Sequence, residues 1–281
     1  MIIIADGGAS KTSWRIIKDG NLHLSLNTQG LHPLFVTSEE ISNVIINRIL
    51  PNVAPENITS IFFYGAGCSQ PEYVEVVMKP LNQLFKNALV RVESDLLGTA
   101  RALCGTLPGM AAILGTGSNA CQYNGINITR SIVSLGYILG DEGSGAVLGK
   151  RILKDYLVGT MPSHLSKLFL LEYDLDINKS LQHVYLNSQP NKFLASLAHF
   201  AFTHRRDPWI QQLLKTHFDE FICNIIKSFP DYDKQLLHLS GSVAAYFGEE
   251  IQQSAFCHNV KIGKIIQYPI DLLVDYHTKL R

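Results

Sequence analysis

The chain contains 281 residues, 46% of them hydrophobic and 17% charged, a composition typical of a globular protein with one large core or two moderate cores; we expect two. Lysine plus arginine and aspartate plus glutamate each number 24, and basic residues form no run longer than a pair, so the charge pattern of a nucleic-acid-binding protein is missing. The apolar run at residues 1–5 is too short for a signal peptide, and no later run is long enough to span a bilayer. We therefore expect a cytoplasmic protein with no membrane partner.

The N-terminal segment predicts a strand, a polar glycine loop and a returning strand. An apolar run covers residues 2–6, glycine and polar residues fill 7–12, and a second apolar run at 13–17 ends at the hairpin signal Asp19-Gly20, before a third strand at 22–26. The loop differs from a Walker phosphate loop, because that motif leads from a strand into a helix. A kinase of the Walker type is therefore disfavoured.

Helical and extended patterns then alternate. Helices are predicted at 38–50, 71–85 and 95–104, and strands at 58–64 and 89–93. The N-terminal part therefore has the order βββαβαβα, which is characteristic of a ribonuclease-H-like mixed sheet.

The same order begins again at residue 110. A strand, a glycine loop at 114–119 and a second strand are followed by a turn signal at Asn124-Gly125 and by an apolar run at 132–139, which we expect to be the third strand. An acidic glycine loop at 140–145 then opens a helix. This recurrence predicts an internal duplication, with two lobes of one fold.

The rest of the chain predicts a helical insert and a closing α/β segment. The insert covers about 163–229 and has helical periodicity. A buried strand at 236–239 leads into a strand-to-helix turn at 240–247, which would suit a phosphate or nucleoside group, and a strand at 262–268 and a helix at 269–280 complete the chain.

The two central glycine loops suggest a binding site. Glycines let the backbone approach a ligand, and consecutive free N–H groups attract anions, so the loop at 114–119 suits a phosphate. The acidic side chains of the loop at 140–145 suit sugar hydroxyls or hydrated magnesium. Ordinary hairpin and N-cap turns have the same composition, and for either loop taken alone that alternative is preferred.

The cysteines are scattered, odd in number and without Cys-x-x-Cys spacing. We expect all five to be buried as small hydrophobic residues and not to bind metal. They are Cys68, Cys104, Cys121, Cys223 and Cys257.

Four motifs together resemble the sugar kinase, heat-shock-protein-70 and actin superfamily, and more closely the N-acetylglucosamine kinases and the related activator ATPases. They are Asp-Gly-Gly-Ala-Ser-Lys-Thr at 6–12, Leu-Gly-Thr-Gly-Ser at 114–118, Gly-Asp-Glu-Gly-Ser-Gly at 140–145 and Ser-Gly-Ser-Val-Ala at 240–244. The resemblance implies an α/β fold with two ribonuclease-H-like lobes around a central cleft. The lobes would be residues 1–104 and a larger C-terminal lobe, 105–281, which contains the helical insert and whose last helix crosses back to the first lobe.

The resemblance also implies an ATP-dependent sugar kinase, with N-acetylglucosamine as the first candidate substrate, ATP and Mg²⁺ as cofactors and a homodimer as the expected assembly. Asp6 would bind magnesium, and Asp95 would be the catalytic carboxylate. The sugar would be contacted by His32, Asp95, Thr116 and Asp141. The nucleotide would be bound by Gly8, Ser10, Lys11, Thr12, Thr116, Gly117, Ser118, Gly241, Ser242 and Ala244.

The chemistry of the residues agrees with these roles, because a sugar hydroxyl that attacks the γ-phosphate needs a carboxylate to accept its proton. For a lone aspartate at a helix start such as Asp95, a plain N-cap is the alternative. Two positions depart from the kinase pattern: His32 stands where these kinases usually have Asn, and Ser134-Leu135 stand where they often have Gly-Trp. Both lie on the sugar side, so the phosphate donor is better supported than the acceptor.

Two other functions stay open. An activator ATPase would have a cysteine directly before the Gly-Thr-Gly loop, to share an iron–sulfur cluster across a dimer. Here Ile113-Leu114 precede the loop, and Cys104 and Cys121 do not match that pattern, so this function ranks below the kinase. A catalytically silent regulator that binds ATP or sugar is the third.

Overall fold

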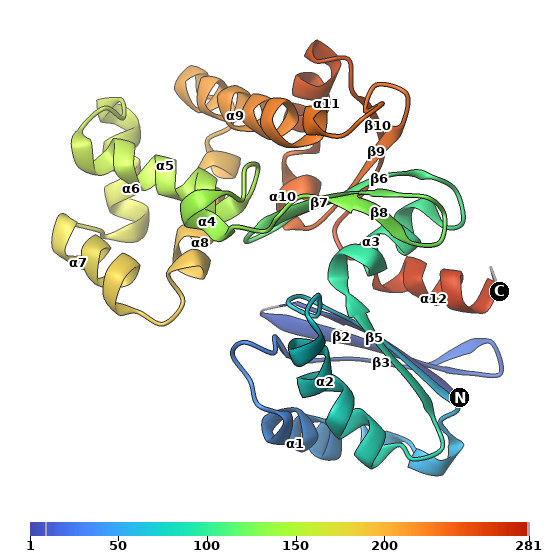
Figure 1. The fold of residues 1–281 in the computed structure, drawn as a ribbon. Coiled ribbons are helices and arrows are strands. Elements are labelled where there is room, and N and C mark those ends of the chain that lie inside the picture. Colours follow the sequence, from blue (N-terminus) through green and yellow to red (C-terminus); the bar gives the residue numbers. More distant parts are fainter. Residues whose placement is uncertain (9, 280–281) are drawn as a thin grey trace. The chain divides into compact units, whose positions relative to one another are not determined.

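The computed structural model describes residues 1–8 and 10–279 (Figure 1). The chain forms two compact units, each with its own five-stranded sheet. Unit 1 contains Met1–Leu107, Asn124–Ile128 and the C-terminal segment from Tyr268, and unit 2 contains Pro108–Tyr123 and Thr129–Gln267. The expected α/β class with two lobes is confirmed.

The sheet of unit 1 has the order β3-β2-β1-β4-β5. Neighbours β1, β2 and β3 are antiparallel, whereas β4 runs parallel to both β1 and β5. This is the mixed order that the βββαβαβα pattern predicts. The elements are β1 (Ile2–Gly7), β2 (Lys11–Lys18), β3 (Asn21–Gln29), α1 (Ser38–Arg48), β4 (Ser60–Gly65), α2 (Pro71–Leu84), β5 (Leu89–Ser94), α3 (Asp95–Cys104) and α12 (Ile270–Lys279), with short 3-10 turns at Leu50–Asn52 and Pro55–Asn57.

Both faces of this sheet are covered, because alternate residues of its strands point to opposite sides. Ile3 and Phe63 pack with apolar residues of α1 and α2 in one core cluster. Ile4, Phe62 and Leu273 belong to a cluster on the other face, where α3 and α12 contact each other. Figure 1 shows α1 and α2 together on one side of these strands.

The sheet of unit 2 has the order β10-β9-β6-β7-β8, with β6 and β7 antiparallel and β9 parallel to both β6 and β10. Its strands are β6 (Gly109–Leu114), β7 (Ser118–Tyr123), β8 (Ile128–Ser131), β9 (Leu236–Ser240) and β10 (Lys261–Ile266). Its helices are α4 (Gly136–Leu139), α5 (Gly145–Val158), α6 (Ser163–Tyr173), α7 (Ile177–Leu181), α8 (Pro190–Thr203), α9 (Pro208–Glu220), α10 (Ser242–Tyr246) and α11 (Gly248–Cys257), with π-helical turns η3 (Gln182–Leu186) and η4 (Phe221–Ile225) and a 3-10 turn at Ile226–Ser228.

The helical insert contributes a large part of the unit 2 core. Helices α5 and α8 pack closely, since a Cβ atom on Gly149 would lie only 1.8 Å from the carbonyl oxygen of Leu194. Fully buried Phe200, Phe218 and Phe221 share one cluster with residues of β6 and β9.

The apolar run at 132–139 is not the third strand, and that prediction was wrong. The strand is β8, which ends at Ser131, and the run continues into the four-residue helix α4. Gly136 has φ +69°, which breaks an extended conformation, and Val133, Ile138 and Leu139 are exposed. Hydrophobicity alone cannot separate a buried strand from an exposed apolar turn.

The prediction that all five cysteines are buried was correct for three of them. Cys68, Cys104 and Cys121 are buried, whereas Cys223 and Cys257 are exposed. The two exposed thiols lie at helix positions that face solvent, which residue type alone does not reveal.

Within residues 1–8 and 10–279, each helix is too short or too polar to cross a bilayer.

Candidate functional site

Two aspartates meet at one edge of the unit 1 sheet. Asp6, near the end of β1, pairs with Tyr64 of β4, which pairs in turn with Glu93 of β5. Strand β5 leads directly into α3, whose first residue is Asp95. Parallel strands β1, β4 and β5 therefore bring Asp6 and Asp95 to the same end of the sheet.

Burial raises the pKa of both carboxylates, and the charge of Asp95 adds to the shift of Asp6. Burial, and then the charge of Asp95, raise the pKa of Asp6 to about 7, although Lys11 and Arg15 oppose the shift. Burial raises the pKa of Asp95 to about 6, against the lowering effect of backbone N–H groups. A carboxylate with a pKa in this range is a better proton acceptor at neutral pH than an ordinary aspartate.

Asp95 is not the N-cap of α3. The cap is Ser94, whose hydroxyl accepts a hydrogen bond from the backbone N–H of Leu97 at 3.2 Å. The backbone N–H of Leu96 donates to Asp95 Oδ1 at 2.8 Å, which orients the carboxylate at the helix start. Ser94, and not Asp95, therefore caps this helix, so the alternative interpretation of Asp95 as a plain N-cap is wrong.

The glycine loop between β1 and β2 lies beside this pair. The backbone N–H of Gly8 donates to the carbonyl of Lys11 at 2.8 Å, so the loop is narrow, and Ser10 at its tip is exposed. The Lys11 ammonium lies 4.0 Å from the ring centroid of Tyr268. Thr12 is fully buried, and its hydroxyl has no hydrogen-bond partner among the described residues.

His32 lies in the loop after β3 and packs against the turn after β4. A Cβ atom on Gly67 would lie 2.6 Å from the His32 ring, so this glycine is needed for the contact. The backbone N–H of Leu34 donates to Nδ1 at 3.3 Å, and the Phe35 ring lies 4.9 Å away. Burial lowers the pKa of His32, so the ring is neutral at physiological pH.

In unit 2, hydrogen bonds join the two central glycine loops. The backbone N–H groups of Gly145 and Ala146 donate to the carbonyls of Gly115 and Thr116, at 2.8 and 3.1 Å. The hydroxyl of Ser118 donates to the carbonyl of Glu142 at 2.8 Å. Two motifs separated in the sequence are therefore in direct contact.

Asp141 of the acidic loop lies against Gly117 and Ser118 of the other glycine loop. Its backbone is left-handed, with φ +61°, and a Cβ atom on Gly117 would lie 2.9 Å from Asp141 Oδ2. Burial raises the pKa of Asp141, while the backbone N–H of Ser118 lowers it. Gly117 thus leaves space for a carboxylate that is partly exposed.

The turn from β9 into α10 approaches the same loops. Gly241 has φ +110°, and a Cβ atom there would lie 2.3 Å from the carbonyl oxygen of Leu114, so only glycine fits. Ser242 is exposed, whereas Ala244 is completely buried in the unit 2 core. In this turn, Gly241 and Ser242 are the groups that a ligand could reach.

Two residues that support these loops had not been singled out in the sequence. His217 of α9 is 1% exposed, lies close to the backbone of Gly143 and Ser144, and has a pKa lowered to about 3 by burial and by Arg151. Phe221 lies directly beneath Gly143, at 2.9 Å from a Cβ placed there. Both residues lie far along the chain from the loop at 140–145, so no local sequence pattern indicates that they contact it.

The donor groups of unit 1 fit a phosphate chain with a hydrated divalent cation. Asp6 supplies a carboxylate, Lys11 in the glycine loop supplies an ammonium group, and Thr12 offers an unpartnered hydroxyl. No set of three His, Cys, Asp or Glu side chains among the described residues is placed to hold a metal ion. A cation bound through one carboxylate, water and phosphate oxygens is the usual arrangement for magnesium.

Comparison with known proteins gave no matching protein-family model and no matching curated protein. Among solved structures, the chain is similar to the "putative N-acetylglucosamine kinase" of Porphyromonas gingivalis, at 36% identity over 99% of both chains and with a TM-score of 0.93.

Two further structures share the fold at lower identity. One is the "putative N-acetylglucosamine kinase" of Chromobacterium violaceum, at 19% identity over 100% of this chain and 98% of that one, with a TM-score of 0.74. The other is a ROK family glucokinase of Streptomyces griseus, at 13% identity over 98% of both chains, with a TM-score of 0.58. By its identity to the P. gingivalis protein over almost the whole length of both, the chain belongs to the N-acetylglucosamine kinase and activator-ATPase family of the sugar kinase, heat-shock-protein-70 and actin superfamily.

Proposed function

We propose that the protein is an ATP-dependent sugar kinase that transfers the γ-phosphate of ATP to a hydroxyl of an amino sugar, with N-acetylglucosamine as the first candidate. The observation that carries the proposal is Asp95, a partly buried carboxylate with a pKa raised to about 6, at the same sheet edge as Asp6 and the glycine loop. That combination provides a proton acceptor beside a phosphate-binding loop.

The relatives support the same class of reaction. Two of the similar structures are named as putative N-acetylglucosamine kinases, and a third is a glucokinase solved with glucose and AMPPNP. A sugar as phosphate acceptor and ATP as donor follow for this chain as part of the proposal.

Unit 1 contains the proposed proton acceptor and some of the proposed phosphate-binding residues. Asp95 accepts the proton of the sugar hydroxyl as that oxygen bonds to the γ-phosphorus, while the bond from this phosphorus to the bridging oxygen breaks and ADP leaves. The Leu96 N–H keeps the carboxylate oriented. Lys11 and the N–H groups of its loop carry the positive charge that phosphate oxygens require. Asp6 would hold a hydrated Mg²⁺ ion, which would neutralise negative charge on the phosphates.

Unit 2 contains the proposed sugar-binding carboxylate and further proposed phosphate-binding residues. Asp141 accepts hydrogen bonds from sugar hydroxyls, and the loop of Thr116, Gly117 and Ser118 directs its backbone toward phosphate. Gly241 and Ser242 border the adenosine, where the left-handed glycine permits close approach.

The choice of sugar depends on positions that differ from the usual kinase pattern. His32 is neutral and fixed by Leu34, so it offers one ring nitrogen to a substrate. Leu135 is exposed and next to Gly140, with its Cβ 3.3 Å from a Cβ placed on that glycine. These two residues are the proposed determinants of which sugar is accepted.

An assay of ADP release tests the proposal. The purified protein with MgATP is offered N-acetylglucosamine, N-acetylmannosamine, glucosamine, glucose and no sugar, and each product is identified by mass. We expect ADP release to depend on an amino sugar and to match phosphosugar formation one to one. ADP release that is equal without sugar would favour the activator ATPase, and binding without turnover would favour a silent regulator.

A further inference from the structure

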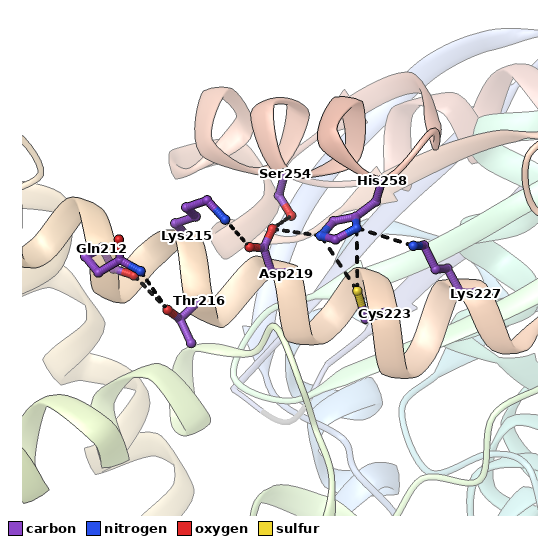
Figure 2. Close-up of polar contacts among 8 residues, drawn as sticks. All are labelled: Gln212, Lys215, Thr216, Asp219, Cys223, Lys227, Ser254 and His258. Carbon is purple, nitrogen blue, oxygen red and sulfur yellow. Dashed lines mark hydrogen bonds and ion pairs between the residues drawn. The ribbon is translucent and has the colours of Figure 1, made fainter.

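A second cluster of reactive side chains lies in unit 2, on α9, η4 and the end of α11 (Figure 2). Asp219 is its centre: Oδ1 accepts a hydrogen bond from the Ser254 hydroxyl at 2.7 Å and lies 3.2 Å from Nε2 of His258. Oδ2 accepts from the Lys215 ammonium. None of these residues belongs to the motifs that the proposed kinase uses.

The partners of His258 define its tautomer. The Lys227 ammonium lies 3.3 Å from Nδ1 and can only donate, so Nδ1 accepts. Nε2 then carries the hydrogen and donates it to the Asp219 carboxylate. The imidazole is therefore fixed in orientation on both sides.

Cys223 faces this ring. Its sulfur lies 3.7 Å from both Nδ1 and Nε2 of His258, and the residue is exposed (Figure 2). The hydrogen bond to Asp219 raises the pKa of Lys215, with smaller contributions from Cys257 and Cys223, so both thiols lie within the field of that ammonium. Cys223 is set apart by its contact with an imidazole that is bonded to a carboxylate and to the Lys227 ammonium, and an exposed thiol in such surroundings is typical of a reactive cysteine.

We infer that Cys223 is a site of covalent modification, a nucleophilic thiol that reacts with peroxides and soft electrophiles in preference to the other exposed thiol, Cys257. With a hydroperoxide, a sulfur–oxygen bond forms and the oxygen–oxygen bond breaks. The sulfur loses two electrons and becomes a sulfenic acid, and the second oxygen leaves as water or alcohol with the thiol proton. One molecule of a small thiol then forms a mixed disulfide with the sulfur and releases water, and a second molecule returns the cysteine and leaves as the disulfide of the small thiol.

Modification of Cys223 can change the packing of the acidic loop at 140–145 through contacts in the core. Cys223 and Phe221 belong to the same π-helical turn, and π-helical turns are frequent at functional sites. Phe221 is fully buried beneath Gly143, and Gly143 lies two residues after Asp141. A group added to Cys223 changes the packing of η4, and the loop at 140–145 is the next structure in contact with it.

Competitive alkylation of the full chain tests the site. A limiting amount of iodoacetamide at neutral pH joins Cys223 Sγ to the acetamide carbon, with iodide leaving and the thiol proton passing to buffer, and peptide mass spectrometry follows each cysteine. Cys257 is the internal control, since it is exposed as well. We expect Cys223 to react about tenfold faster than Cys257, and His258→Gln to remove most of that difference. Equal rates at the two thiols, or an unchanged rate in His258→Gln, would overturn the inference.

A second measurement tests the coupling and does not depend on any enzyme activity. Amide hydrogen exchange of residues 140–145 is compared before and after peroxide treatment, in the native chain and in Cys223→Ser. We expect faster exchange in the treated native chain and no change in Cys223→Ser. If the native loop is unchanged although Cys223 carries the modification, the link to the acidic loop is wrong. If Zn²⁺ binds with one-to-one stoichiometry and protects both thiols, the cluster is a metal site and the modification inference is overturned.

Discussion

Asp95 and Ser94 are adjacent residues at the start of α3 with separable roles. Ser94 caps the helix, and Asp95 carries the raised pKa. Asp95→Asn keeps the shape and a hydrogen-bond acceptor but cannot take a proton, so we expect turnover to fall by a factor of about 10² or more with ATP binding retained.

The matched control is Ser94→Ala, which removes the cap. It should lower the free energy of unfolding by about 1 kcal/mol and leave turnover of the folded protein nearly normal. Steady-state kinetics, nucleotide titration and denaturant unfolding of both variants give the comparison. Near-normal turnover in Asp95→Asn would mean that another group accepts the proton.

Asp6 makes stability depend on pH in the free protein. Its pKa is raised from 3.8 to about 7, so between these values the folded state binds more protons than the unfolded state, and stability falls as pH rises through this window. Asp6→Asn removes the charge. We expect this variant to be more stable than the native chain at pH 8 by about 1 kcal/mol, with a smaller difference at pH 5.

Denaturant unfolding across this range, in buffer with a chelator, measures the effect. Added Mg²⁺ with ATP should reverse the order, because the native carboxylate gains a partner and the amide does not. A difference that is the same at every pH would show that Asp6 is not the titrating group.

At the scale of a loop, Gly117 and Gly115 offer a matched pair. A Cβ on Gly117 would lie 2.9 Å from Asp141 Oδ2, whereas a Cβ on Gly115 meets nothing within 4 Å. Gly117→Ala should displace the Asp141 carboxylate and raise the KM for the sugar by about tenfold, while Gly115→Ala should have a much smaller effect. Kinetics with sugar and ATP varied separately test this. If the two substitutions change the KM for the sugar equally, Asp141 does not contribute to sugar binding.

At the scale of the whole molecule, unit 1 is completed by the C-terminal helix. The ring Nε2 of His277 in α12 lies 2.9 Å from the Tyr64 hydroxyl, and its ring stacks on Phe62 at 3.8 Å. A chain truncated after Gln267 loses these contacts and exposes the apolar face of β1 and β4. We expect unit 1 of this chain to unfold at a lower temperature, with faster hydrogen exchange in its strands.

The control for the truncation is Asp271→Asn, which removes the ion pair between Arg15 and Asp271 and keeps α12. The Asp271 side chain is 76% exposed. Exposed pairs of this kind contribute less than about 1 kcal/mol, so this variant should unfold almost like the native chain. If the truncated chain keeps native exchange in β1 and β4, then α12 is not needed for unit 1.

The sequence by itself determined the elements and the loops that connect them. Hydrophobic periodicity placed α3 at residues 95–104, and the glycine loops predicted tight turns such as the one between β6 and β7. These features depend on neighbouring residues, because turn geometry, capping and amphipathic spacing are local. Where the pattern was ambiguous, at 132–139, the prediction failed.

Only the tertiary structure decided which groups meet. The sheet register brings Asp6 beside Asp95, and packing places His217 and Phe221 under the acidic loop. The exposure of Cys223 beside His258 follows from how α11 packs on α9. Such contacts join segments that are distant in sequence, and their distances depend on strand register and helix packing, which a one-dimensional pattern does not contain.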